Sequence, residues 1–593
     1  MDFKEKTLAH SLMKMQLREK NPAIKFKKDG QWQELSWSNY YKKITQFGNA
    51  LLSVGIQPGD RIAIMSNTRF EWAISDLAVI GIQAITVPIY HNSTTEDVEF
   101  ILNNAEVKVL ICEGKSTVKT WNQVSQQCPT IKKVICFEKT ACEGDIQHWD
   151  ELIKIGDAYS AKHPREFQAR CETIQPQTIA SILYTSGTTG KPKGVVISHT
   201  QIISEVAEAF YLFNVSEEDI SLSFLPYAHI LGRVELWGHI YVGYTIAFAE
   251  SIDRLRNNLI EIKPTVIIAV PRIFEKIYSA IWSQVETQKL KLKLFNWALH
   301  IGKQVGHLRM THQSIPVSLL AQFELAKKLV LGKIADAFGG RLRFAISGGA
   351  PLAKEIAEFF HAADLLVLEG YGLTETTAAI TINTPFNYKF GTVGRPIGDV
   401  KIKIAEDGEI LIKSHKVMVE YYKNPEATAE VMKDGWFCTG DIGELSPNGE
   451  LRITDRKKDL IKTAGGKYVA PQRIENLLKL TPLIGHVLIH GDQKKFIVAL
   501  LTLDRVLLEQ FAKENQISFQ VWTDLVEHPQ IQDVVRKAVA DANAHLASFE
   551  SIKKYLVLDC EFSVESGDLT PSLKVKRKFL DKKFAKEISN LYH

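Results

Sequence analysis

Apolar residues in the first half of the chain recur with two alternating periods. Asn39 to Val54 has helical spacing, and Arg61 to Met65 has the pattern of a strand that follows a Pro-Gly-Asp turn. The alternation continues, with a helix expected at 95–104 and strands expected at 84–89, 107–112, 222–225, 244–248 and 266–270. Such repeated alternation of strands and helices is typical of an α/β domain with a largely parallel sheet.

The pattern of apolar segments and turns changes from about Gly391. Short segments such as Val400–Ile404 and Gly408–Ile412 alternate with Gly, Asp and Pro turns, which indicates a small β-barrel or sheet. The charged run Asp455–Asp459 interrupts this pattern and is typical of an exposed linker before a smaller α+β domain. We therefore expect a mixed α/β and α+β protein, with an N-terminal domain over 1–454, a β-rich subdomain at about 388–454 and a C-terminal domain over 455–593.

Length, composition and charge limit the classes of protein to which the chain can belong. A chain of 593 residues exceeds what one hydrophobic core supports, and its 45% apolar and 24% charged residues are ordinary for a soluble globular protein. The net charge of +4 is small for this length and argues against a nucleic-acid partner. Seven scattered cysteines without metal-ligand spacing, and an N-terminus without a signal core, favour a cytoplasmic protein. The longest apolar stretch, Leu77–Ile89, is too short to span a bilayer.

One segment, Tyr184–Gly194, interleaves residues that suit phosphate groups. It reads Y-T-S-G-T-T-G-K-P-K-G and stands between two apolar runs, so a strand, a loop and a strand are expected. Glycines let a backbone approach a ligand closely, hydroxyls donate hydrogen bonds and lysines supply positive charge, which together suit a triphosphate. It is not a Walker A loop, because Thr185 stands five positions before Gly190 and Pro192 follows Lys191.

Four later segments carry further candidate chemistry. The pair Gly348-Gly349 ends an apolar strand where a flat base can lie against the backbone, and Glu369–Thr377 offers an aromatic ring, hydroxyls and a carboxylate able to ligate Mg²⁺. Asp441 lies in a glycine turn and suits a ribose diol, while Lys574 follows a turn near the C-terminus. Taken singly, each segment is as typical of a tight turn or a solvated surface residue.

In this order and spacing the segments resemble those of AMP-forming acyl-CoA synthetases, in the adenylate-forming superfamily of acid–CoA ligases, luciferases and peptide-synthetase adenylation domains. The similarity runs from Trp37 to about Leu580. Within the superfamily the chain is most similar to long-chain fatty-acid–CoA ligases, on the segments 225–229, 270–276, 294–298 and 569–574. The resemblance implies that a hinge joins the two domains and that the C-terminal domain is mobile.

The resemblance also implies a two-step reaction with Mg²⁺, ATP and coenzyme A. The carboxylate of a fatty acid attacks the α-phosphate of ATP to give acyl-adenylate and pyrophosphate, and the thiol of coenzyme A then displaces AMP. The first step builds negative charge at phosphorus, which requires positioned cations rather than a nucleophilic side chain.

Site residues follow from the same resemblance. The catalytic set is Lys574, Glu375 and Thr185, of which Thr185 and Glu375 hold Mg²⁺. ATP contacts are expected from Thr185, Ser186, Gly187, Thr188, Thr189, Gly190, Lys191, Gly349, Ala350, Tyr371, Gly372, Thr374, Asp441 and Arg456. The acyl site includes His229, Arg233 and Gly348. The hinge is Asp455, and Lys462, Gly465 and Gly466 approach coenzyme A. Some relatives have a gating tryptophan where this chain has Arg233, so the gate stays an open question.

The sequence leaves other functions open beside a long-chain fatty-acid–CoA ligase. One is a fatty-acyl-AMP ligase that passes the acyl group to a carrier protein, and another is a CoA ligase for medium-chain or aromatic acids. A lipid-trafficking protein with residual nucleotide binding would predict a decayed site, whereas Lys574, Glu375 and Asp441 are all present. The basic segment Gln284–His307 predicts an amphipathic helix packed on its own domain, with peripheral contact at the inner face of a membrane as the alternative.

Overall fold

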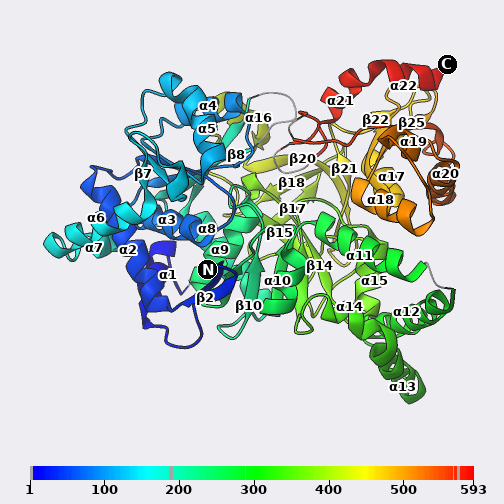
Figure 1. The fold of residues 1–593 in the computed structure, drawn as a ribbon, viewed down its shortest axis with the longest axis horizontal. Helices are drawn as coiled ribbons and strands as arrows, with labels where there is room; N and C mark the ends of the chain where they lie inside the picture. The colour runs from blue at the N-terminus through cyan, green and yellow to red at the C-terminus, as the bar shows by residue number, and fades with distance from the viewer. Residues whose placement is uncertain (1–3, 186–190, 287–288, 565, 571–573) are drawn as a thin grey trace.

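The computed structural model describes residues 4–185, 191–286, 289–564, 566–570 and 574–593. In Figure 1 the chain passes from helices and strands at the left, through a central body, to a separate group of C-terminal elements at the upper right. Two large sheets build the body, and a smaller antiparallel sheet lies between the body and the C-terminal group.

The first large sheet has seven strands, and all its neighbours are parallel except β8 and β9. In spatial order they are β7 (Gln147–His148), β6 (Lys133–Cys136), β5 (Val109–Cys112), β3 (Arg61–Met65), β4 (Ile85–Ile89), β8 (Ile179–Thr185) and β9 (Lys193–Ser198). The helices of this region are α1 (Leu8–Lys14), α2 (Trp37–Ser53), α3 (Phe70–Gly81), α4 (Thr95–Asn104), α5 (Lys115–Val124), α6 (Trp149–Lys162) and α7 (Glu166–Thr173). These strands are almost wholly apolar, as expected for a sheet covered on both faces.

The second large sheet has nine strands, with a parallel centre and antiparallel edges. In spatial order they are β16 (Arg395–Pro396), β15 (Ala378–Ile382), β14 (Val367–Leu373), β13 (Phe344–Ser347), β12 (Val266–Ala269), β10 (Ile220–Ser223), β11 (Thr245–Phe248), β1 (Ile24–Lys28) and β2 (Gln31–Leu35). Its helices are α8 (His199–Leu212), α9 (Ile230–Val242), α10 (Leu255–Ile262), α11 (Pro271–Glu286), α12 (Lys289–Met310), α13 (Val317–Ala326), α14 (Gly332–Asp336) and α15 (Lys354–Ala362). One buried core joins this sheet to a face of the first.

A five-stranded antiparallel sheet follows. It comprises β17 (Lys401–Ile404), β18 (Glu409–Lys413), β20 (Trp436–Leu445), β19 (Met432–Lys433) and β21 (Leu451–Arg456), with α16 (Pro425–Val431) beside them. The strand β21 continues through Asp455 and Arg456, which pair with Ile442 and Asp441. The charged run is therefore not wholly an exposed linker, because Asp455 is buried within the sheet.

The C-terminal group has its own core. It contains the hairpin β22 (Ile461–Lys462) and β23 (Tyr468–Val469), and the sheet β24 (Ile484–His490), β25 (Ile497–Leu503) and β26 (Ile552–Val557). Its helices are α17 (Pro471–Leu478), α18 (Arg505–Glu514), α19 (Trp522–Val526), α20 (Pro529–Ala544), α21 (Arg577–Lys583) and α22 (Ala585–Tyr592). This mixture of one mixed sheet and helices is the expected α+β class.

The pattern of the sequence predicted most of these elements closely. The strand at 61–65 and the helix at 95–104 have the expected bounds, and the apolar passage Leu77–Ile89 is the buried end of α3 followed by β4. The strand expected at 222–225 begins two residues earlier, as β10. Within the part of the chain that the structure describes, no helix is long and apolar enough to cross a membrane.

Candidate active site

The candidate site lies where neighbouring parallel strands of the nine-stranded sheet end. His229 follows β10, the Val270–Arg272 segment follows β12, and Gly348 to Ala350 follow β13. Carboxyl ends of adjacent parallel strands meet at one edge of a sheet, which is where α/β proteins bind ligands. Segments far apart in the sequence are thereby brought together.

The glycine pair after β13 faces the loop that carries His229. Gly349 has φ of 81°, a conformation that favours glycine, and a Cβ there would lie 3.7 Å from Cε1 of His229. His229 caps α9, since its Nδ1 accepts the N–H of Leu231 at 3.2 Å. Burial, and then the nearby charge of Lys574, lower the pKa of His229 to about 4. The imidazole is therefore neutral at pH 7, with Nδ1 as acceptor and the proton on Nε2.

Tyr371, Asp441 and Arg456 form a connected group on β14, β20 and β21. The Tyr371 hydroxyl donates to Oδ2 of Asp441 at 2.7 Å, and Nε of Arg456 lies 3.3 Å from its Oδ1. Burial raises the pKa of the Asp441 carboxyl, while Arg456 and the Tyr371 hydroxyl oppose that shift. An acceptor held in this way is suited to the hydroxyls of a ribose.

Glu375 and Thr185 are the oxygen-bearing residues expected to hold Mg²⁺. Oε1 of Glu375 accepts the hydroxyl of Tyr421 at 2.8 Å, and Thr185 ends β8 with its hydroxyl 3.4 Å from the Lys193 carbonyl oxygen. Mg²⁺ is held by one or two carboxylates together with substrate phosphates rather than by an all-protein cage. One carboxylate with one hydroxyl fits that donor set, and no group of three or more His, Cys, Asp or Glu side chains able to hold a metal occurs among the described residues.

Only part of the segment expected to bind phosphate belongs to the residues that the structure describes. Ser186, Gly187, Thr188, Thr189 and Gly190 lie outside the described residues. Lys191, just beyond them, is exposed, and its Nζ lies 5.3 Å from the ring centroid of Phe100. The two strands expected on either side of the segment are present as β8 and β9, and they pair antiparallel.

Lys574 reaches this site from the C-terminal group. Its backbone N–H donates to the Thr570 hydroxyl at 3.0 Å. The surrounding protein atoms, and then the charge of Arg456, lower the pKa of Lys574, whereas Asp441 and Glu375 act to raise it. The lowered pKa of about 8 still leaves the amine mostly protonated at pH 7. The charge of this C-terminal lysine is thus coupled to Arg456, Asp441 and Glu375 of the preceding part of the chain.

The expected hinge residue bridges the two parts of the chain. Oδ1 of Asp455 accepts the N–H of Arg456 at 2.6 Å, and Oδ2 accepts the N–H of Gln472, in the first turn of α17, at 3.3 Å. Burial raises the pKa of Asp455 to about 6. Lys462, Gly465 and Gly466 are exposed residues of the β22–β23 hairpin. No hydrogen bond or ion pair between described residues joins this hairpin to the site.

Arg233 takes a position that the sequence did not predict. Its side chain has no exposed surface, and Nη2 lies 2.9 Å from Oδ1 of Asp76, which is equally buried. The guanidinium carbon lies 5.1 Å from the ring centroid of Trp72 and 4.8 Å from that of Trp237. Arg233 is itself a residue of α9, and these contacts hold its side chain against α3. Gly348, the other acyl-site candidate, lies beside Leu231, whose Cδ2 would be 3.3 Å from a Cβ at that glycine.

Three residues that the sequence did not single out support the site. Tyr421 orients Glu375, and Oε2 of Glu369 accepts the N–H of Leu352 at 3.0 Å, which fixes the loop after β13. Arg272 contacts the C-terminal group, with Nη2 3.5 Å from Oδ2 of Asp504 and Nη1 3.4 Å from the carbonyl oxygen of Gly485. Tyr421 gave no sequence signal, whereas Glu369 and Arg272 lie inside segments that resemble the family.

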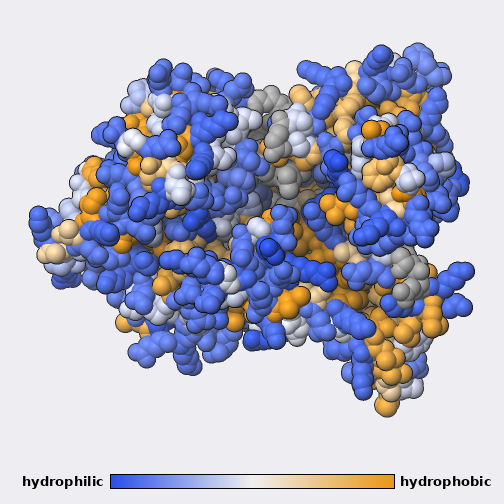
Figure 2. Space-filling view, in the orientation of Figure 1, coloured by the Kyte–Doolittle hydropathy of each residue, from blue (hydrophilic) through white to orange (hydrophobic). Residues whose placement is uncertain are grey.

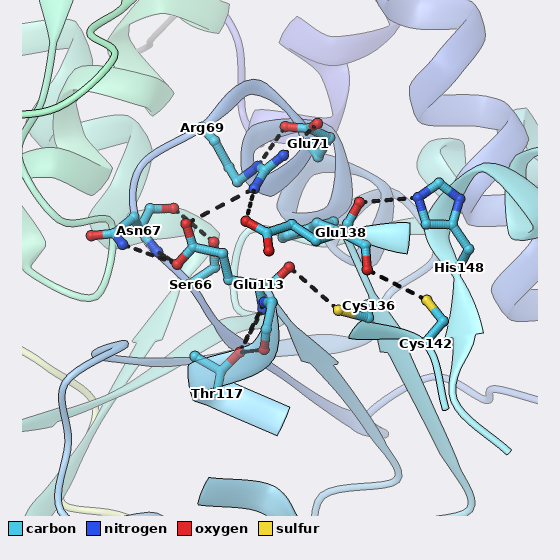
Figure 3. A network of polar contacts seen from close by, with 12 residues as sticks. Ser66, Asn67, Arg69, Glu71, Glu113, Thr117, Cys136, Glu138, Cys142 and His148 are labelled. Atoms are coloured by element: carbon cyan, nitrogen blue, oxygen red, sulfur yellow. Dashed lines mark hydrogen bonds and ion pairs between the residues drawn. The ribbon is translucent and has the colours of Figure 1, made fainter. Parts of the chain in front are cut away.

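A second polar network lies at the carboxyl edge of the seven-stranded sheet (Figure 3). Arg69 forms a two-point ion pair with Glu71 at 2.8 and 2.9 Å and approaches Glu113 and Glu138, each at 3.9 Å. Next to this network, the Thr68 hydroxyl donates to the carbonyl oxygen of Leu225 at 2.5 Å. Through Leu225 the edge of the first sheet therefore supports the loop that carries His229.

Comparison with known proteins identifies relatives over nearly the whole chain. A family model described as AMP-binding enzyme matches residues 14–422, and one described as AMP-binding enzyme C-terminal domain matches residues 458–593. A long-chain-fatty-acid–CoA ligase of Mycobacterium bovis is 36% identical over 569 residues, with 95% of this chain and 93% of that relative covered. Long-chain-fatty-acid–CoA ligase 5 of Rattus norvegicus is 32% identical over 603 residues, with 96% and 86% covered.

Solved structures share the fold at lower identity. The adenylation domain of a carboxylate reductase from Mycobacterium chelonae superposes with a TM-score of 0.75 at 22% identity, covering 99% of this chain and 91% of that one. A Mycobacterium tuberculosis fatty acyl CoA synthetase gives 0.60 at 20% identity, covering 99% of this chain and all of that one.

Proposed function

The chain belongs to the AMP-binding enzyme family, and from this membership we infer its reaction: it is a long-chain fatty-acid–CoA ligase. It activates a fatty acid with ATP and Mg²⁺ to an acyl-adenylate and then transfers the acyl group to coenzyme A, releasing AMP. The assignment of roles rests on the Asp441 carboxylate, which Tyr371 and Arg456 hold in place, together with the charge of Lys574, which acts on Asp441 and Glu375.

The first half-reaction needs charge stabilisation at the α-phosphate. A carboxylate oxygen attacks phosphorus and pyrophosphate departs, so negative charge accumulates on the phosphoryl oxygens. Lys574 supplies an ammonium next to that position. Glu375, held by Tyr421, and Thr185 would hold Mg²⁺, which neutralises charge on the phosphates when bound. No side-chain base is required, because a fatty acid is ionised at neutral pH.

Binding of the nucleotide falls to the groups around β13, β14 and β20. The open backbone at Gly349 and the ring of Tyr371 would enclose adenine, and Asp441 with Arg456 would bind the ribose. Glu369 keeps the Gly348–Leu352 loop in place through the N–H of Leu352. The neutral His229 faces Gly349 and can donate Nε2–H to a substrate oxygen. These roles use the charges and donors that the side chains have in this structure.

The second half-reaction requires a different arrangement of the C-terminal group. Lys574 occupies the site here, whereas Lys462, Gly465 and Gly466 are exposed on their hairpin. We propose that the group turns about Asp455, so that the hairpin replaces Lys574 and borders the path of coenzyme A. Gly466 has φ of 75° and open space around its Cβ position, which leaves room for a ligand.

The assignment is tested by separating the two half-reactions. Loss of one positioned charge-stabilising group costs on the order of 10²–10³ in rate. Lys574→Ala should therefore nearly abolish acid-dependent ATP–pyrophosphate exchange and still convert supplied acyl-adenylate and coenzyme A to thioester. Lys576→Ala, two residues away on the same segment, is the matched control and should retain both activities. Equal damage to both half-reactions by Lys574→Ala would contradict the role given to this lysine.

Chain-length preference is tested with a panel of saturated acids. Each methylene that becomes buried contributes roughly 0.8 kcal/mol, so kcat/KM should rise several-fold per methylene until the acyl site is full. A maximum at a short or aromatic acid would overturn the long-chain assignment. AMP release that proceeds without coenzyme A but needs a carrier protein would favour the fatty-acyl-AMP ligase instead.

We also propose contact between the basic segment 284–307 and a membrane surface. The apolar positions Phe295, Ala298, Ile301 and Val305 of α12 are buried against the body and are not free for lipid. The exposed lysines of its first two turns, Lys289, Lys291 and Lys293, remain as the contact.

A further inference from the structure

Two cysteines that are six positions apart in the sequence meet at the carboxyl end of β6 (Figure 3). Cys136 is the last residue of β6, and Cys142 follows the short helix η3 (Lys139–Ala141). The N–H of Cys142 donates to the carbonyl oxygen of Lys139 at 3.2 Å, which turns the chain back at this point. As a result, the two thiols lie within hydrogen-bond reach of each other. Two cysteines can be bridged only where their side chains point together in this way.

Each of the two sulfur atoms also has a backbone acceptor. The thiol of Cys136 donates to the carbonyl oxygen of Glu113 at 3.3 Å, and the thiol of Cys142 donates to the carbonyl oxygen of Glu138 at 3.6 Å. The carboxylates of Glu113 and Glu138 both approach Arg69, in the network that Figure 3 shows. The thiol pair is therefore part of the polar network at the carboxyl edge of the seven-stranded sheet.

One member of the pair is open to solvent. Cys136 has no exposed surface, whereas Cys142 is only partly buried. Cys112 is the register partner of Cys136 on β5, but it is fully buried and held inside a strand. Figure 2 shows a mostly hydrophilic surface over the left part of the body, where Figure 1 places β7, the neighbour of β6. A water-soluble oxidant therefore reaches the pair from the side of Cys142.

We propose that Cys136 and Cys142 form a reversible disulfide, with hydrogen peroxide as the oxidant, and that this bond weakens the support of the loop that carries His229. The thiolate of Cys142 attacks one oxygen of the peroxide, the O–O bond breaks, and a sulfenic acid and water result. The sulfur of Cys136 then attacks the sulfenic sulfur, so that the S–S bond forms, the S–O bond breaks and a second water leaves. Two thiols have then given two electrons to one peroxide. Dithiothreitol reverses the bond by thiol–disulfide exchange.

The disulfide affects the neighbouring network, because neither of its sulfur atoms carries a proton to donate. The carbonyl oxygen of Glu113 thereby loses a donor, while the Glu113 carboxylate accepts two hydrogen bonds from Asn67, each 3.0 Å long. The next residue, Thr68, holds Leu225 in the loop that carries His229. Since one weak hydrogen bond is lost, we expect oxidation to raise the KM for the fatty acid about two- to threefold and to leave the KM for ATP unchanged. This expectation rests on the proposed function, whereas the disulfide itself does not.

Peptide mapping tests the bond directly. Trypsin separates residues 134–139, which contain Cys136, from residues 140–154, which contain Cys142. The full chain is treated with hydrogen peroxide, its free thiols are blocked, and the digest is analysed by mass spectrometry. The two peptides should be linked after oxidation, and dithiothreitol should separate them. A link from Cys136 to Cys112 instead, or no link at all, would overturn the proposal.

The rate of cross-linking should depend on pH. Burial raises the pKa of Cys136 to about 11. Burial also raises the pKa of Cys142; the Cys136 thiol acts to lower it, and the charges of Glu151 and Lys139 act in opposite directions. Because the thiolate is the nucleophile, the rate should rise about tenfold between pH 7 and pH 8. A rate that does not change with pH would overturn a reaction that begins at the Cys142 thiolate.

Variants separate the bond from its effect on the loop. Cys136→Ser keeps a hydroxyl donor for the Glu113 carbonyl, and Cys142→Ser changes a partly exposed side chain. Both variants should lose the link, and their KM for the fatty acid should no longer respond to peroxide. Cys560→Ser changes another partly exposed cysteine and is the matched control, which should cross-link like the unchanged chain.

The outcomes distinguish the two parts of the proposal from the proposed function. If Cys136→Ser fails to fold, Cys142→Ser decides. A linked chain whose KM for the fatty acid is unchanged, or a peroxide response that persists in Cys142→Ser, would overturn the effect on the loop. A reduced chain that makes no fatty acyl-CoA would overturn the proposed function, and the linked peptides would still decide whether the disulfide forms.

Discussion

The buried pair Asp76–Arg233 makes a strong prediction about stability. Neither side chain has exposed surface, and the two charged groups approach to 2.9 Å between α3 and α9. Burial raises the pKa of Asp76 and lowers the pKa of Arg233, and in each case the partner's charge opposes the shift. Each ion is therefore tolerated in the interior mainly because the other is present.

Removing one partner leaves an uncompensated charge in the core. Such losses cost about 3–5 kcal/mol, whereas replacing both ions by apolar groups of similar size is close to neutral or stabilising. We therefore expect Asp76→Leu and Arg233→Met each to be strongly destabilising. The double variant should be much more stable than either single variant, and this non-additivity is the signature of the pair.

The assay uses tryptophan emission, because Trp72 and Trp237 lie against the guanidinium and report its surroundings. With m values of about 1–3 kcal/mol per molar urea, each single variant should lower the urea midpoint by about 1 M or more. Asp533→Asn, which breaks an exposed ion pair on α20, is the control and should leave the midpoint unchanged. Single variants as stable as the unchanged chain, or a double variant as unstable as the worse single one, would refute the reasoning.

Three further predictions concern the domains and pH. Arg272→Ala removes a partly exposed contact between the body and the C-terminal group. Pyrophosphate exchange should therefore slow by up to about fivefold, while thioester formation from supplied acyl-adenylate stays unchanged. Equal slowing of both half-reactions would count against a specific role of Arg272 in the first step. Asp455→Pro fixes φ at the proposed pivot, and Gly466→Leu fills the proposed path of coenzyme A. Both variants should keep pyrophosphate exchange and lose thioester formation. If Asp455→Pro still makes thioester, the C-terminal group does not turn about Asp455. Burial raises the pKa of Glu369 to about 7 from an ordinary value of 4.5. Between these two pH values the folded state holds a proton that the unfolded state releases, so the stability of the fold falls as the pH rises from about 4.5 to about 7. Glu369→Gln should flatten the dependence of the thermal midpoint on pH between about 4.5 and 7, and an unaltered slope would argue against the shift.

Local pattern accounts for much of the architecture. The strand β3 and the helix α4 have the bounds that hydrophobic spacing predicts, and the alternation of such elements gave the parallel sheets. The fold class is confirmed, and so is the resemblance to the AMP-binding enzymes. The strand expected at 222–225 is shifted by two residues from β10, because Phe224 and Leu225 are buried and apolar although they lie beyond the end of the strand.

The candidate site was predicted as a set of residues, and their roles stay predictions. Sequence order cannot say that Tyr371 touches Asp441, because β14 and β20 belong to different sheets that meet only in the packed molecule. Arg456 reaches Asp441 within one sheet, through the pairing of β20 with β21. Tyr421 was missed for the same reason, since its contact with Glu375 spans 46 positions and belongs to no continuous motif.

By itself, then, the sequence determined the elements, the family and the chemical types at the site, because these depend on local spacing and on motifs that are continuous in the chain. Only the tertiary structure decided which groups pair, which are buried and which stay uncovered. It buried Arg233 against Asp76, placed Lys574 where its charge acts on Asp441 and Glu375, and left Val317 of α13 exposed. Burial and long-range pairing depend on how distant segments pack, and that packing sets the free energy of each charge and each apolar surface.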